Sequence, residues 1–343
     1  MMNWAILEIA KIQTVARLLM SPGSILSLPQ LVVAFGIALA FLAYRQIRRR
    51  GSVRLLVILR ATLRRNIFLN RSTYADLFYA FVNTFAISGL IGWAMISGLS
   101  VSSSVTHSLR SIFGGNAPST APDWLLRAGA TFLLFITYEF AYYVDHYLNH
   151  KIPFLWEFHK VHHTAEVLTP LTVFRVHPID TLIFVNIVAV IVGFTHGTLI
   201  YAIGKNIDIF QIDGSNVITV VCLFSLGQLQ HSQFWIPFTG LGGRVLLSPA
   251  HHQIHHSTDP AHYDSNLGSF LAVWDWIFGT LFIPAKESPR LRFGVVGGDT
   301  DPHRISGLMI DPTLNAFRAL RPAWSWAALT FVRRPWAATP TQT

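Results

Sequence analysis

Long apolar runs are the feature that most limits what this chain can fold into. Five runs are each long enough, or nearly so, to cross about 30 Å of hydrocarbon as a helix: 25–44, 77–99, 128–144, 181–203 and 214–234. Only 13% of the residues are charged, against roughly 25% in soluble domains. The runs predict an all-α, polytopic membrane protein with four or five transmembrane helices; Pro29 and Gln30 weaken the first run, which starts late or lies partly in the interface.

The positive charges indicate how the chain is oriented. The net charge is +9, and arginines crowd the stretch 45–65 directly after the first run. Basic residues beside a span favour the cytosolic side and anionic headgroups, and apolar runs on both sides argue against nucleic-acid binding. The single cysteine, Cys222, excludes an internal disulfide. We expect no cleaved signal peptide, because the chain opens without a short apolar region and cleavage site.

This orientation predicts the course of the chain. With loop 45–74 in the cytosol, the run 77–99 leads outward, and the Ser/Gly-rich stretch 100–124 is an exterior connection. The third span returns and ends near His146, and the last two spans form a hairpin through 204–213. Everything after about residue 235 is then cytosolic and forms a helical cap. The Trp- and Arg-rich stretch 321–336 is either an amphipathic surface helix or a helix packed on this cap.

Histidines gather in three clusters, each with spacings of three or four residues. The first is His146 and His150; the second is His159, His162 and His163; the third is His252, His255 and His256. Residues so spaced share one face of a helix. Under the predicted topology the three clusters and His231 meet at the cytosolic membrane face, which indicates a shared metal site.

The residues alone leave the metal open. Imidazole suits zinc, copper, iron and nickel alike. Three alternatives remain: core or surface histidines without metal, a structural zinc site, and a haem with two histidine ligands. Structural zinc sites use four ligands and commonly cysteine, and a haem would leave most of the histidines unexplained.

The three clusters and their surroundings resemble the fatty acid hydroxylase/sterol desaturase superfamily. The matching stretches include "LWEFHKVHHTAEVLTPLTVFRVHPID" (155–180), "QHSQ" (230–233) and "DPAHYDSNLGSFLAVWDWIFGTLF" (259–282). The resemblance implies two iron ions and O2 as co-substrate, with zinc able to replace iron on purification. His251 falls at a variable position and is left out. The implied ligands are His146, His150, His159, His162, His163, His231, His252, His255 and His256.

The resemblance implies oxidation of a C–H bond in a lipid, either hydroxylation or desaturation of a sterol or acyl chain.

Since no HPGG-type motif is present, we expect a separate electron donor, a ferredoxin or cytochrome b5 with its reductase. The expected domains are 1–124 with the first spans, 125–285 with the catalytic part, and a cytosolic tail 286–343. The chain's ending weakly favours a bacterial inner membrane. Two alternatives are a pteridine-dependent ether-lipid monooxygenase and a non-catalytic, zinc-stabilised lipid-binding membrane protein.

Residues outside the ligand set receive narrower predictions. Glu139 and Asn266 are the candidates for a role at the reaction centre. Glu139 shares a helical face with His146 and is expected to accept a proton from a ligand imidazole or to make an interhelical contact; Asn266, with Asp264, is expected to brace the cage or cap a helix. Asp145, Arg175, His177 and His196 are expected in supporting polar contacts, with His177 a candidate tenth ligand and His196 a candidate cavity residue.

Overall fold

The structure is a computed structural model that describes residues 19–24, 27–63, 65–87, 92–295, 301–304 and 306–320. The chain is mostly helical. Its α-helices are α2 Leu28–Arg50, α3 Leu55–Thr62, α4 Arg65–Phe68, α5 Arg71–Phe81, α7 Gly98–Phe113, α8 Asp123–Lys151, α9 Pro153–His163, α10 Pro178–Ile203, α11 Val217–Cys222, α12 Gln228–Gln230, α13 Gly240–Val245, α14 Pro249–His255, α15 Val273–Phe278 and α16 Asp311–Ala319. Two short strands, β1 Gln211–Ile212 and β2 Ser215–Asn216, form an antiparallel hairpin.

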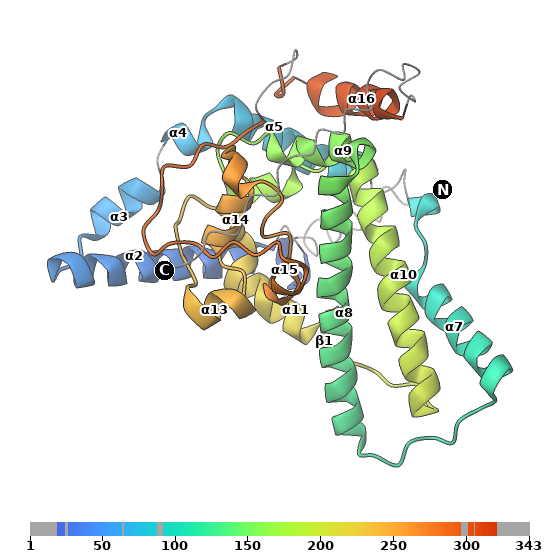
Figure 1. The fold of residues 1–343 in the computed structure, drawn as a ribbon. Helices are drawn as coiled ribbons and strands as arrows, with labels where there is room; N and C mark the ends of the chain where they lie inside the picture. Colours follow the sequence, from blue (N-terminus) through green and yellow to red (C-terminus); the bar gives the residue numbers. More distant parts are fainter. Residues whose placement is uncertain are drawn as a thin grey trace, which may run out of the picture.

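Three helices, α7, α8 and α10, lie alongside one another and form a tall stem (Figure 1). Small residues allow α7 to approach α10 closely. A Cβ added to Gly193 would lie 2.7 Å from the Gly98 carbonyl oxygen, and one added to Gly197 would lie 2.4 Å from that of Ser102. Thr106 Oγ1 also donates to the Gly197 carbonyl at 2.9 Å. Close backbone approach at small residues four apart is typical of helix packing in membranes.

A second group of elements sits at the upper end of the stem. Helices α9 and α14 lie beside the upper part of α8, and α16 runs across the top (Figure 1). The ring of Phe317 on α16 contacts Phe154 on α9. The C-terminal half of the chain therefore returns to the end of α8 at which the first two histidines lie.

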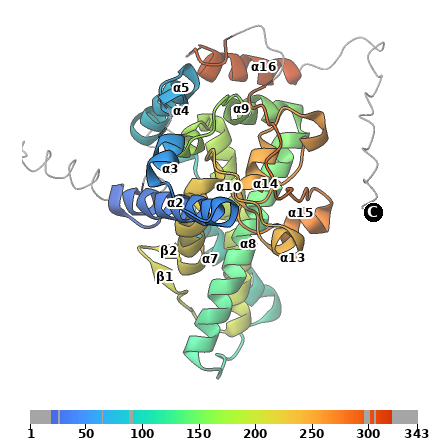
Figure 2. The ribbon, with the colours of Figure 1, turned by 90° about the vertical axis from the view of Figure 1, so that its left-hand side faces the viewer.

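Helix α2 does not run alongside α8 and α10, because in both views its axis points in a different direction from theirs (Figures 1 and 2). Its buried residues Ala34 and Ala38 pack against Leu229 and Ile236. Among the described residues, α2 and α10 are the two helices long and apolar enough to cross a membrane, judged by length and composition. These two candidate spans therefore do not share one direction (Figures 1 and 2).

Several predicted segments differ from the structure. The run 77–99 is not one helix, since α5 ends at Phe81 and is followed by a π-helical stretch, Val82–Ile87, and a 3-10 turn, Gly92–Ala94. The stretch 100–124 was expected to be a loop, and this is wrong for its first half: α7 begins at Gly98, where Ser97 Oγ accepts the Ser100 N–H. Ser102 there is buried and supplies a small side chain that packs on α10.

The other predicted runs match the structure more closely. The runs 25–44 and 181–203 correspond to α2 and α10, and 128–144 lies inside α8. The run 214–234 is divided among α11, a π-helical stretch Leu223–Gly227 and α12. The predicted surface helix at 321–336 lies outside the described residues.

Candidate metal centre

The nine histidines of the predicted ligand set come from four places in the fold. His146 and His150 lie one turn apart near the end of α8, and the second cluster occupies the last turns of α9. The third cluster lies on α14, where His256 is the C-terminal cap, and His231 follows α12. Prolines at the first positions of α9 and α14 start these two helices, because proline already has a helical φ and lacks only an N–H that would be unpaired there.

Five of these histidines form one group, called here the five-histidine group: His146, His150, His159, His163 and His255. One ring nitrogen from each lies within 4.8 Å of all the others. The Nε2 atoms of all five are buried and have no hydrogen-bond partner. Buried polar nitrogens are normally paired, so five unpaired ones converging on a point fit a metal ion.

The other four form the four-histidine group: His162, His231, His252 and His256. Their Nε2 atoms face one another, at 3.0 Å between His162 and His231, 2.8 Å between His231 and His252, and 3.0 Å between His252 and His256. Two nitrogens held about 2.1 Å from one ion and at right angles lie about 3.0 Å apart. These spacings therefore fit nitrogens that share an ion.

Neighbouring residues are divided between the two groups. On α9, His163 belongs to the five-histidine group and His162 to the four-histidine group. At the end of α14, His255 and His256 are divided in the same way. The side chains of successive residues on a helix point about 100° apart. Both α9 and α14 can therefore place one histidine in each group.

Burial favours the neutral form, which metal binding requires, in several of these imidazoles. Burial lowers the pKa of His150 to about 4 and holds the pKa values of His163 and His255 well below 6.5. Unprotonated nitrogens are therefore available in the five-histidine group at neutral pH, and metal binding needs neutral imidazole.

The second nitrogen of several rings is fixed by a hydrogen bond. Backbone carbonyls accept from Nδ1 of three rings: Leu267 from His146 at 2.7 Å, Ser265 from His255 at 2.9 Å, and Arg175 from His162 at 3.2 Å. A carbonyl can only accept, so Nδ1 carries the proton and Nε2 carries the lone pair in these rings. Such contacts orient metal-binding histidines and set their tautomer.

Two carboxylates act in the same way. Asp180 Oδ2 lies 3.1 Å from His159 Nδ1, and Asp264 Oδ1 lies 3.3 Å from His150 Nδ1. Asp264 also binds Lys151 at 2.8 Å, and these contacts lower its carboxyl pKa against the opposing effect of burial. Sequence reasoning expected Asp264 to brace the cage but missed Asp180, whose signal was an acid at the start of α10 in "RVHPID".

Glu139 does not contact a ligand histidine, contrary to one prediction. Its Oε2 accepts the backbone N–H groups of Phe270 and Leu271, each at 2.8 Å. The alternative, a polar contact between segments, is what the structure contains. Glu139 is two turns, or about 10.5 Å along the helix axis, before His146, and its side chain is turned to a different segment.

Asn266 braces the backbone and does not reach the histidine nitrogens. Its Nδ2 donates to the carbonyls of His251 and Phe282, both at 3.0 Å, and its Oδ1 accepts the Phe282 N–H at 2.8 Å. With φ of 56° it adopts the left-handed conformation that asparagine tolerates. A catalytic role for Asn266 therefore has no support from its contacts, whereas the predicted bracing does.

Four further residues make supporting contacts. His177 caps α10 by accepting the Ile179 N–H, so it stands outside both histidine groups. His251 lies outside them as well and pairs with Ser248 and the Gly243 carbonyl. Arg175 is fully buried and pairs with Asp76 at 2.6 Å. His196 joins α10 to α7 through Ser102 at 3.1 Å.

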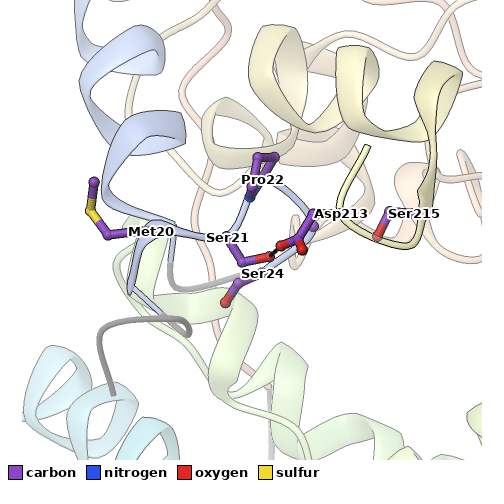
Figure 3. A pocket seen from close by; sticks show the side chains of 7 residues that line it. Met20, Ser21, Pro22, Ser24, Asp213 and Ser215 are labelled. Atoms are coloured by element: carbon purple, nitrogen blue, oxygen red, sulfur yellow. Dashed lines mark hydrogen bonds between the residues drawn. The ribbon is translucent and has the colours of Figure 1, made fainter. Parts of the chain in front are cut away.

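A cavity of about 670 Å³ opens directly beside both groups. His146, His159, His162 and His231 line one end of it, and most of its wall is apolar, from α8, α10 and residues 209–231. From Asp145 to Leu134 it follows α8 for about 17 Å. Its far end shares Gly23 and Ser215 with a more open hollow, in which Ser21 donates to Asp213 (Figure 3).

Comparison with known proteins agrees with this geometry. Residues 131–280, which carry all nine histidines, match the family described as fatty acid hydroxylase. Over this part, the chain is similar to the fatty acid hydroxylase family. The family resemblance predicted from the histidine clusters is thereby confirmed.

Curated relatives are lipid-modifying enzymes by name. The chain is 29% identical over 177 residues to an ornithine lipid hydroxylase of Rhizobium tropici, covering 51% of this chain and 48% of the relative. It is 28% identical to the alkylglycerol monooxygenase of Xenopus tropicalis, covering 45% and 31%, and 28% identical to human cholesterol 25-hydroxylase, covering 49% and 58%. The match thus spans about half of the first relative and about a third of the second. No solved structure matches significantly.

Proposed function

We propose that this chain is a membrane-bound di-iron oxygenase that hydroxylates or desaturates a lipid, such as a sterol or an acyl chain, with O2 and external electrons. The observation that carries the proposal is the position of two convergent imidazole groups at the end of a long apolar cavity. An apolar cavity with a few convergent polar groups is typical of a small-molecule site, and a long apolar wall suits an alkyl chain. The names of the relatives support the same reaction class.

The chain's own residues would bind and orient the reactants. The five-histidine and four-histidine groups would each hold one iron ion, and the two ions would supply O2 activation and C–H oxidation. Asp180, Asp264 and three backbone carbonyls hold the imidazoles in the binding tautomer. The apolar walls contributed by α8 and α10 would align the lipid chain and keep water from the reacting carbon. Zinc suits the same nitrogen ligands and would replace iron in some preparations.

The finer arrangement in the membrane is part of the proposal. We propose four or five spans, with a cytosolic cap carrying the metal centre, in a bacterial inner membrane. Residues 1–124 would hold the first spans, 125–285 the catalytic part and 286–343 a cytosolic tail. Electrons would come from a separate ferredoxin or cytochrome b5 with its reductase.

One alternative oxygenase remains open within the same family. Several relatives are named alkylglycerol monooxygenase, a name that supports an ether lipid as substrate. In this alternative a reduced pteridine would be the electron source. Activity that depends strictly on added pteridine would favour this alternative. A non-catalytic, zinc-stabilised protein would instead bind metal without turnover.

The deciding experiment is metal content on protein purified from iron-supplemented cells, followed by a lipid comparison. We expect about two irons per chain in the wild type, and a loss in the His159→Ala/His255→Ala double variant, which removes two of the five-histidine ligands. The His251→Gln variant is the matched control, since His251 is buried beside His252 but belongs to neither group. Lipids of cells expressing the wild type should contain an oxidised species that the double variant lacks. Folded wild-type protein without metal would overturn the proposal.

A further inference from the structure

Asp145 is a cavity residue that the metal centre does not use. It lies on the face of α8 that lines the cavity, together with Leu134, Tyr138 and Tyr142. These positions are three or four residues apart, so their side chains form one stripe along the helix. Asp145 is at the histidine end of the stripe and directly precedes His146.

One oxygen of this carboxyl group is paired and the other is not. Oδ2 accepts from Asn149 Nδ2 at 3.0 Å, and the same amide nitrogen lies 3.1 Å from Asp180 Oδ1. Oδ1 is buried and has no hydrogen-bond partner, and only 6% of the residue is exposed. A buried carboxylate oxygen without a partner is costly, so this site favours a ligand with a polar hydrogen.

The other acidic side chains nearby do not combine an unpaired oxygen with a place in the cavity wall. Asp180 uses one oxygen for His159 and the other for Asn149. Glu139 also has an unpaired oxygen, but it is not among the residues that line the cavity. In the hollow at the far end, Asp213 already accepts from Ser21 (Figure 3).

We propose that Asp145 binds a hydroxyl group of the lipid substrate, and that this contact selects lipids with a free hydroxyl close to the oxidised carbon. A hydroxyl fits this position because it can donate to a carboxylate and can also accept from a carboxylic acid. The neighbouring His146 places the bound hydroxyl beside the five-histidine group. The remaining alkyl chain would extend along the stripe toward Leu134. This inference rests on the proposed function, because it names the substrate class of the same site.

The test compares binding of two lipids that differ only in their hydroxyl groups. The probes are an alkylglycerol and the matching alkyl propyl ether, which has the same chain but no hydroxyl. Native mass spectrometry of the metal-loaded protein, without O2 or reductant, gives the ratio of their affinities. Since a buried carboxyl oxygen would gain its missing hydrogen-bond partner, we expect the wild type to prefer the alkylglycerol by roughly tenfold.

The variants assign that preference to one side chain. Asp145→Leu should bring the affinity ratio close to one, and the isosteric Asp145→Asn should give an intermediate ratio with metal content unchanged. Thr137→Val is the matched control, since Thr137 is buried on the same helix, bonds its own backbone and does not line the cavity. Its ratio should equal that of the wild type.

Two results would overturn the inference. Equal affinities in the wild type would mean that the cavity does not recognise a hydroxyl, and a preference retained in Asp145→Leu would place recognition elsewhere. Neither result depends on turnover. Failure of the protein to oxidise any lipid, with the binding preference intact, would instead contradict the proposed function.

Discussion

His159 Nδ1 lies 3.1 Å from Asp180 Oδ2, which joins a candidate metal ligand on α9 to the first turn of α10. The Asp180 carboxylate also holds Asn149. It thereby connects three helices beside the five-histidine group.

Replacing Asp180 with asparagine should weaken metal binding at that group. The neutral amide is a poorer acceptor for the His159 N–H, and losing such a partner commonly costs roughly 10- to 100-fold in metal affinity. Metal titration followed by mass spectrometry should show one weakened site and one unchanged site. The matching Asp264→Asn variant, at a more exposed contact with His150, should have a smaller effect. Equal loss from both groups would contradict the assignment of Asp180 to one of them.

Removing the Asp76 carboxylate should strongly destabilise the fold. Arg175 and Asp76 form an ion pair in which both side chains are fully buried, and Asp76→Ala would leave the guanidinium charge without its partner. Breaking a buried pair from one side commonly costs about 3–5 kcal/mol. Thermal unfolding of the purified protein in detergent measures the change.

The control for this prediction is the exposed pair of Arg71 and Asp301. Arg71→Ala should leave the unfolding temperature nearly unchanged, because exposed pairs contribute little. If both variants unfold at the same temperature as the wild type, the buried pair does not stabilise the chain.

Filling the contact between α7 and α10 should separate the two helices. In Gly197→Ala the new Cβ would lie 2.4 Å from the Ser102 carbonyl oxygen, and overpacking of this kind costs about 1–3 kcal/mol. Gly129→Ala on α8 is the matched control, since nothing lies within 4 Å of its added Cβ and alanine favours a helix by up to about 1 kcal/mol. Unfolding midpoints should therefore move in opposite directions. A neutral Gly197→Ala would mean that α7 does not pack there.

Removal of metal should lower the stability of the whole chain. Without ions, the five buried Nε2 atoms of one group lack partners, and the lone pairs of the other group face each other. A ligand that binds only the folded state stabilises it in proportion to the logarithm of its concentration over Kd. Chelation should lower Tm, and added Fe2+ or Zn2+ should restore it. A Tm that is insensitive to both treatments would contradict a metal centre in this cage.

Much of the site could be predicted from histidine spacing, because helical periodicity specifies which side chains share a face. The division of the nine histidines into groups of five and four could not be predicted, because it depends on how α9 and α14 are rotated relative to α8. The carbonyl partners Leu267 and Ser265 were equally hidden, because every residue has a carbonyl and none marks its role in the sequence. One of the two predicted partners of Glu139, a ligand imidazole, was wrong. Two residues on the same face of a helix can still lie too far apart along the helix axis to touch.

The fold was less predictable than the site. Apolar runs indicate helices long enough for a bilayer, but they do not give the direction of each helix. Helix α2 points in a different direction from the helices that it was expected to run alongside. The serine-rich start of α7 has a loop-like composition, and its pairing with Gly193 and Gly197 becomes apparent only once the two helices lie together.

The division of neighbouring histidines between the two groups limits which parts of this site can move independently. His162 and His163, like His255 and His256, are joined by one peptide bond, so the backbone itself limits how far apart the two groups can move. Much of the cavity wall comes from α10 and residues 209–231, which supply only His231 to the cage, whereas α8 contributes to both. The apolar wall from these segments can therefore change in shape while the spacing of the two histidine groups stays the same.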